Sequence, residues 1–287
     1  MLRRAARRTG LFLVALFLAA CAWELYKALA PDNGGTFVVP LAKTNDLAMP
    51  HTWDMATRLF EPESRAGGQA IWRSVIGYAW YTFRLALLGL ALGTVAGLVA
   101  AVVMSRLRVL ERGLLPWIVM SQTVPLIALA PQVDGWSGRI EVAGWEWPRW
   151  LSVAVLAAFL AFFPISVGTL RGLQSATRAA EELMQSYAAS WWQTLFKLRL
   201  PTAVPSMVPA LKQAATLSVV GVIVAEISIG IDGGIGRAVI SYRQATTGDP
   251  AKTYAAVFGA AALGLFLYGV VVLFDIAVMR HRPQEAE

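Results

Sequence analysis

Apolar residues gather into long stretches that are separated by shorter polar ones along most of the chain. A helix needs about 20 mostly apolar residues to cross a bilayer, and six stretches of roughly that length are present. They run approximately over residues 10–30, 78–104, 113–130, 150–170, 203–229 and 253–279. The pattern predicts an all-α, polytopic membrane protein with about six transmembrane helices.

The six spans divide the chain into four predicted parts. Residues 1–30 form an N-terminal transmembrane helix, and residues 31–73 form a polar extracytoplasmic segment. Residues 74–280 form the membrane core, and residues 281–287 form a short cytoplasmic tail. The core contains one stretch, at about 175–201, that is too polar to cross a bilayer.

This polar stretch is rich in Ala, Glu, Leu, Met and Gln, which favour helix formation. Ser175 or Thr177 is suited to cap a helix start, and Pro201 is suited to end the segment. We therefore predict two short helices on the membrane surface. Such a helix either anchors the chain at the interface or docks a partner, and the hydrophobic pattern alone favours neither.

The composition supports a membrane protein and argues against nucleic-acid binding. Only 15% of the 287 residues are charged, whereas soluble domains carry about 25%. The net charge is +7, but Lys and Arg flank the apolar stretches, as the positive-inside rule expects, and form no basic patch. With both termini inside, 13 Lys and Arg lie on the cytoplasmic side against 10 outside, so we predict cytoplasmic termini.

Few residues are suited to enzyme chemistry. Cys21 is the single cysteine, and the two histidines, His51 and His281, lie far apart without metal-ligand spacing. A phosphate-binding loop of the G-x-x-x-x-G-K-[ST] type is missing, so the chain is not expected to bind ATP in that way. We expect no metal, no cofactor and no catalytic residues.

Four ionisable residues fall within or near the predicted spans. Arg84 and Glu226 lie near the outer ends, where each either snorkels to the interface or lines the mouth of a path. Glu226 is the stronger candidate for a gate or pathway residue, and the alternative is a structural pair with Arg84 or Lys212. We expect Asp275, near the inner end of the last span, to meet Arg280 or headgroup water.

The N-terminus allows two interpretations. Arginines precede an apolar run that ends in Leu18-Ala19-Ala20-Cys21, which resembles a lipoprotein signal peptide with its cleavage box. The apolar run nevertheless continues from Ala22 to Ala30, interrupted only by Glu24 and Lys27. This continuity favours a retained helix, and either interpretation places Cys21 on the outer side.

Three smaller patterns are expected to be structural. Four tryptophans between residues 131 and 150 are typical of an interfacial belt, the alternative being a docking surface for a binding protein. Gly89, Gly93 and Gly97 form a stripe suited to close helix packing. The glycine-rich run at 230–236 predicts a flexible outer turn.

The polar stretch also resembles the cytoplasmic loop of importer permeases of the ABC class. Their pattern is E-A-A, three residues, G, nine residues and I-x-L-P. This chain has Glu182-Leu183-Met184, then Ala188 at the glycine position, then Leu198-Arg199-Leu200-Pro201. The spacing is met throughout, and Glu182, Leu200 and Pro201 match outright. The two alanines are replaced by Leu183 and Met184.

Further residues resemble one subgroup of these permeases, those for nitrate, sulfonates, taurine, thiamine precursors and riboflavin. The matching features are Phe163-Pro164-Ile165, Pro201-Thr202-Ala203-Val204-Pro205-Ser206, Ala225-Glu226 and Gly233-Gly234-Ile235-Gly236. The resemblance covers about residues 70–280.

The resemblance implies a type I importer permease fold in a bacterial inner membrane. The loop Glu182–Pro201 would dock on a separate ATPase subunit, with Ala188 allowing close approach, Pro201 fixing the turn into the fifth span, and Leu198 and Leu200 completing the motif. A binding protein would deliver a small polar or anionic solute or a vitamin-like compound. A homodimer is expected to complete the path, and a paired second permease is the alternative.

Overall fold

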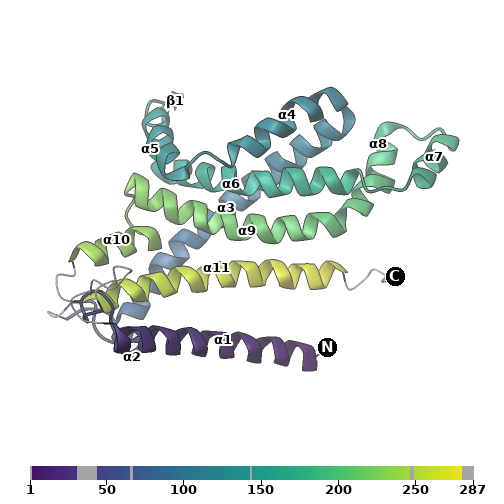
Figure 1. The fold of residues 1–287 in the computed structure, drawn as a ribbon. Coiled ribbons are helices and arrows are strands. Elements are labelled where there is room, and N and C mark those ends of the chain that lie inside the picture. Colours follow the sequence, from purple (N-terminus) through teal and green to yellow (C-terminus); the bar gives the residue numbers. More distant parts are fainter. Residues whose placement is uncertain (1, 31–43, 65–66, 143, 246–248, 280–287) are drawn as a thin grey trace. The chain divides into compact units, whose positions relative to one another are not determined.

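The computed structural model describes residues 2–30, 44–64, 67–142, 144–245 and 249–279, which are mostly helical, with one short hairpin and connecting turns (Figure 1). The elements are α1 Leu2–Leu29, α2 Thr52–Arg58, α3 Ile71–Arg106, α4 Arg108–Ser121, α5 Leu126–Ser137, β1 Glu141–Val142, β2 Trp145–Glu146, α6 Arg149–Leu173, α7 Arg178–Ser186, α8 Trp191–Thr194, the π-helical turn η1 Leu195–Arg199, α9 Leu200–Ile229, α10 Ile235–Ala245 and α11 Pro250–Met279.

Five stretches of helix among the described residues are long and apolar enough to cross a membrane. They are Gly10–Leu29, Ile71–Arg106, Arg149–Leu173, Trp191–Ile229 and Pro250–Ile276. The all-α prediction and the first, second, fourth, fifth and sixth predicted spans are thereby confirmed.

The third predicted span, 113–130, is broken. Helices α4 and α5 meet at an angle of 103° across residues 122–125, and together they pass as a sixth candidate span or as a re-entrant loop. Pro125 disfavours the helical conformation at Val124 and starts α5, which explains the break. The length of an apolar run indicates that it could span the membrane, but it does not reveal such a bend.

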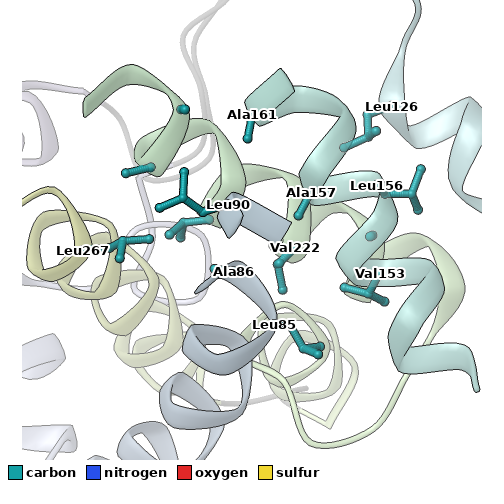
Figure 2. Packing of buried hydrophobic residues seen from close by; sticks show 14 of the residues in the cluster. Leu85, Ala86, Leu90, Leu126, Val153, Leu156, Ala157, Ala161, Val222 and Leu267 are labelled. Atoms are coloured by element: carbon teal, nitrogen blue, oxygen red, sulfur yellow. The ribbon is translucent and has the colours of Figure 1, made fainter. Parts of the chain in front are cut away.

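The chain forms two compact units, one from Met1–Ile76 with Ala238–Phe258 and the other from Gly77–Arg237 with Gly259–Glu287. The core of the second unit brings together apolar faces of α3, α5, α6, α9 and α11 (Figure 2). Many of its residues are small, such as Ala86, Ala157 and Ala161, and this lets the helix backbones lie close together.

The glycine stripe of α3 packs against α6. A Cβ atom at Gly93 would lie 2.7 Å from the carbonyl oxygen of Ala158 and 2.8 Å from the Cβ of Ala161. Gly89 and Gly97 are equally crowded by α6. The expectation that this stripe serves close helix packing is confirmed.

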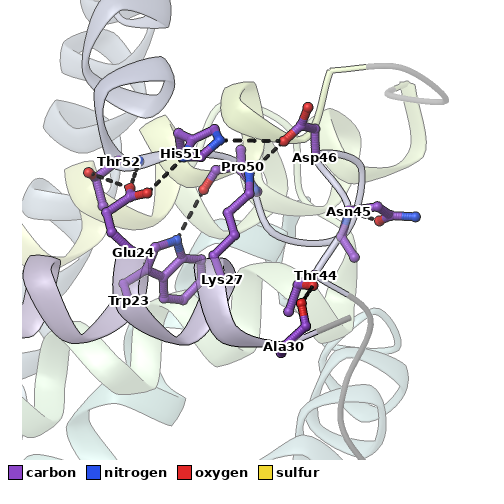
Figure 3. A network of polar contacts seen from close by, with 11 residues as sticks. Trp23, Glu24, Lys27, Ala30, Thr44, Asn45, Asp46, Pro50, His51 and Thr52 are labelled. Carbon is purple, nitrogen blue, oxygen red and sulfur yellow. Dashed lines mark hydrogen bonds and ion pairs between the residues drawn. The ribbon is translucent and has the colours of Figure 1, made fainter. Parts of the chain in front are cut away.

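In the first unit, two charged residues tie the end of α1 to the segment that follows it (Figure 3). Glu24 accepts hydrogen bonds from the backbone and the hydroxyl of Thr52, both at 2.7 Å, and its other oxygen lies 2.7 Å from Nδ1 of His51. Lys27 pairs with Asp46, and this hydrogen bond lowers the pKa of Asp46 below its usual value. Glu24 thus caps α2, whose own N-cap residue has no side-chain bond.

Candidate functional site

Helix α7 forms the first half of the polar stretch, as predicted. Thr177 caps it by accepting a hydrogen bond from the backbone N–H of Ala180 at 3.3 Å. Glu182 is exposed, and the Nε of Arg178 donates to it at 2.9 Å. Leu183 and Tyr187 are 56% and 76% exposed, so α7 presents apolar side chains beside its charged ones.

Ala188 follows α7 in a left-handed conformation, with φ of 51°. Its N–H donates to the carbonyl of Gln185 at 2.8 Å, and the N–H of Ala189 donates to the carbonyl of Met184 at 3.0 Å. This pair of bonds is a Schellman motif, which usually places glycine at the left-handed residue. The glycine of the family pattern is therefore explained here by backbone conformation, whereas the sequence analysis attributed it to close approach.

The second half of the stretch is a helix that runs without interruption into the membrane. A capping box between Ser190 and Gln193 starts α8, and the π-helical turn η1 connects it to α9. Leu198 lies in that turn and Leu200 begins α9, both partly buried. Pro201 is the second residue of α9, so the prediction that it ends the segment is wrong. Proline lacks a backbone donor, and the residues directly before α9 form the π-helical turn η1 and not regular α-helix.

Aromatic side chains dominate the surface of α8 and η1. Trp192 and Phe196 are 53% and 59% exposed and stack with ring centroids 6.0 Å apart. Trp191 lies under the guanidinium group of Arg106 at 4.8 Å. Arg199 pairs with Glu181 of α7 at 2.8 Å, which fixes the two halves of the loop against each other.

Glu226 is fully buried in the second unit, where its carboxyl group joins α3, α9 and the start of α10. One oxygen accepts a hydrogen bond from the Thr82 hydroxyl and the other from the N–H of Gly236, both at 2.8 Å. The Thr82 hydroxyl in turn accepts from the N–H of Ile235 at 2.9 Å. The first N–H groups of α10, those of Ile235 and Gly236, thereby find hydrogen-bond partners. The N-terminus of a helix is also the favoured position for an acidic group.

The glycine-rich run is shaped around this carboxyl group. Gly230 ends α9 in the left-handed conformation, with φ of 73°. A Cβ atom at Gly234 would lie 2.1 Å from the Glu226 carboxyl, so no other residue fits without displacement. The sequence pattern predicts the turn at 230–236, but it does not reveal α10, the role of Thr82 or the capping role of the glycines.

The other ionisable residues of the spans do not converge on Glu226. Arg84 is exposed and lies 5.9 Å from the ring of Tyr81. Lys212 pairs with Asp275 at 2.6 Å. Lys212 is a partner of Asp275 that was not expected. The expected partner Arg280 lies outside the described residues, so that expectation stays a prediction.

The tryptophan-rich outer segment contains α5 and a hairpin of β1 and β2. Trp147 donates to the Ser152 hydroxyl at 3.0 Å, whereas Trp136, Trp145 and Trp150 are exposed. Arg149 pairs with Asp134 at 3.0 Å and donates to the carbonyl of Ile229 at 2.7 Å. The start of α6, directly after the hairpin, is therefore tied to α5 and to the end of α9 in the same unit.

Comparison with known proteins shows the family. Residues 93–280, more than half of the chain, match the model of the inner-membrane components of binding-protein-dependent transport systems. The formylaminopyrimidine transport permease protein ThiX of Halalkalibacterium halodurans is 34% identical over 71% of this chain and 77% of its own. The riboflavin transport system permease protein RibX of Chloroflexus aurantiacus is 29% identical over 44% of each chain.

The fold is similar to that in a crystal structure of an amino acid ABC transporter with histidines. The TM-score is 0.56 at 16% identity, over 71% of this chain and 93% of that one. The chain therefore belongs to the family of binding-protein-dependent transport permeases: it is a membrane-spanning subunit of an ABC importer and not an enzyme.

Proposed function

We propose that this subunit carries a small polar or anionic solute, or a vitamin-like compound, along a path completed by a second copy of the chain. An extracytoplasmic binding protein delivers the solute, and ATPase subunits on the cytoplasmic side drive the movement. The names of the relatives, which refer to formylaminopyrimidine and riboflavin, support a solute of this class.

The coupling surface is the loop Glu182–Pro201. The observation that carries this proposal is the exposure of Leu183, Tyr187, Trp192 and Phe196 on α7, α8 and η1. Exposed aromatic and aliphatic residues next to charged ones are typical of protein interfaces. Because α8 continues through η1 into α9, a movement of the loop would also move a membrane-spanning helix.

Reversing the charge of Glu182 tests the coupling. We expect Glu182→Lys to insert normally but to lose most substrate-stimulated ATPase activity of the reconstituted complex. The intrahelical pair with Arg178 contributes only about 0.5 kcal/mol, because it is exposed. Arg178→Ala is therefore the matched control, since it removes the same pair and leaves the carboxylate for the ATPase. Normal stimulation in Glu182→Lys would refute the assignment.

We also propose Glu226, with Arg84, as part of the outer gate. Opening the path on the outer side would move α10 relative to α9, and the Glu226 carboxyl holds the two together. We expect Glu226→Gln to change the ratio of substrate-stimulated to basal ATPase activity, because an amide offers one acceptor where the carboxyl offers two. A variant that transports at the wild-type rate would exclude this role. Thermal unfolding of the same complex separates a gating defect from misfolding.

A further inference from the structure

The membrane-spanning helices of the second unit differ in what they expose. The mid-span exposed residues of α3 include Leu92, Val95 and Val99, and those of α11 include Leu265 and Phe266. All are apolar, as expected for side chains that contact lipid. The exposed faces of the remaining helices can be compared with these two apolar faces of α3 and α11.

Helix α9 exposes a different kind of face. Its exposed residues recur every three or four positions and form one stripe: Pro205, Pro209, Gln213, Thr216 and Val220. Thr216 satisfies its hydroxyl on the carbonyl of Lys212 in its own helix. The Gln213 amide has no hydrogen-bond partner among the described residues, and a polar group left unpaired in lipid is costly.

A pocket of about 390 Å³ lies beside this stripe, between α6 and α9. Gly168 and Ala210 form its narrow base, since a Cβ atom at Gly168 would lie 2.5 Å from that of Ala210. Polar groups come from both helices: the guanidinium of Arg171, the hydroxyl of Ser206 and the amide of Gln213. Arg171 is exposed and forms no ion pair with any described residue.

We propose that this α6–α9 pocket binds an acidic group of the transported solute on the half of the path nearest α7. The inference rests on the proposed transport function and extends it to a site and a ligand chemistry. Arginine recognises carboxylate, sulfonate and phosphate groups through paired hydrogen bonds, and the amide and hydroxyl add neutral donors. The volume suits a small solute. The unpaired amide of Gln213 is tolerated on the exposed stripe of α9 because this stripe faces water and not lipid.

Cysteine accessibility tests whether the stripe faces water. Cys21→Ser removes the single cysteine, after which Gln213→Cys, Val95→Cys and Leu265→Cys are made separately in the complex reconstituted with its ATPase. The probe is sulfonatoethyl methanethiosulfonate, which reacts with a thiolate and so requires water at the thiol. We expect Gln213→Cys to react at least about tenfold faster than the two controls. Equal rates would show that water does not reach Gln213 and would overturn the inference.

The role of Arg171 is tested by charge selectivity at the same cysteine. Adding Arg171→Gln to Gln213→Cys should slow the anionic probe severalfold and speed the cationic trimethylammonioethyl analogue. No change in either rate would overturn the anion site. A phospholipid phosphate has the same chemistry, so the rates are compared in liposomes with and without phosphatidylglycerol. An Arg171 effect seen only with phosphatidylglycerol would identify a lipid site and also overturn the inference.

These outcomes are separable from a failure of the proposed function. Loss of the ATPase during purification of the wild-type complex would contradict the transport proposal. Labelling of Gln213→Cys that is as slow as that of the two controls, or that does not respond to Arg171→Gln, would contradict only the assignment of the pocket.

Discussion

At the scale of single residues, Ala188 occupies a conformation that non-glycine residues rarely adopt. The cost for alanine is about 1 kcal/mol, and a β-branched side chain raises it further. The residue is exposed, as are most of its neighbours between α7 and α8, so few packing contacts compensate for strain. The order of this loop therefore depends on the side chain at one position.

We expect Ala188→Gly to keep or improve the order of the loop, and Ala188→Val to loosen it by about 1–2 kcal/mol. Hydrogen exchange of the amides of α7 and α8 in the purified complex measures this directly. Ala189→Val is the matched control, because Ala189 has an ordinary backbone conformation. Equal protection in Ala188→Val and Ala189→Val would contradict the conformational explanation.

The sequence indicates that Ala188 and Glu226 are important positions, but it does not show why. The glycine preference follows from a dihedral angle, which a spacing pattern does not contain. The partner of Glu226 is Thr82, 144 positions away, and no periodicity connects the two. The glycine cluster at 233–236 is the one nearby feature of the sequence that could have indicated this role. Glycines let the backbone approach closely, so that its N–H groups can donate to the Glu226 carboxyl.

At the scale of elements, hydropathy located the long spans well, because each is predominantly apolar over 20 residues or more. It did not locate the bend between α4 and α5, where Pro125 breaks the helix within an apolar run. It also missed α10, which is short and carries an amphipathic sequence, Ile235–Ala245. The start of α10 is capped by residues that lie far away in the sequence, Thr82 and Glu226.

That cap predicts how α10 responds to loss of the Thr82 hydroxyl. Thr82→Val keeps the shape of the side chain but leaves the N–H of Ile235 and one oxygen of Glu226 unpaired. Each buried unpaired group costs about 1–3 kcal/mol. We expect a lower unfolding temperature and faster hydrogen exchange at Ile235.

The matched control for the cap is Thr216→Val, since Thr216 donates only to its own helix at Lys212. This variant should keep the unfolding temperature within experimental error of the wild type. If both threonine variants unfold alike, α10 does not depend on the Thr82–Glu226 network.

At the scale of the whole molecule, the bent pair α4 and α5 decides which side of the membrane each later segment faces. If the pair crosses the membrane, the hairpin of β1 and β2 lies on the side where α3 begins, and the loop of α7 and α8 lies on the side where α3 ends. If the pair is re-entrant, the order of all later segments is inverted relative to α3. Coupling to a cytoplasmic ATPase requires the first arrangement when the N-terminus is inside, which the Lys and Arg distribution favours.

We therefore expect Glu141→Cys in the hairpin to react with an impermeant maleimide from the outside of cells, and Arg178→Cys in α7 to react only in inside-out vesicles. Both are made in the Cys21→Ser background, and both positions are exposed, so accessibility is not limited by burial. The reverse result, with Arg178→Cys labelled from the outside of cells and Glu141→Cys only in inside-out vesicles, would show a re-entrant pair, because both residues follow the pair and α6 separates them. That result would leave the permease family intact, but it would require either an external N-terminus or a different coupling surface, because α7 could not then reach the ATPase from the predicted orientation.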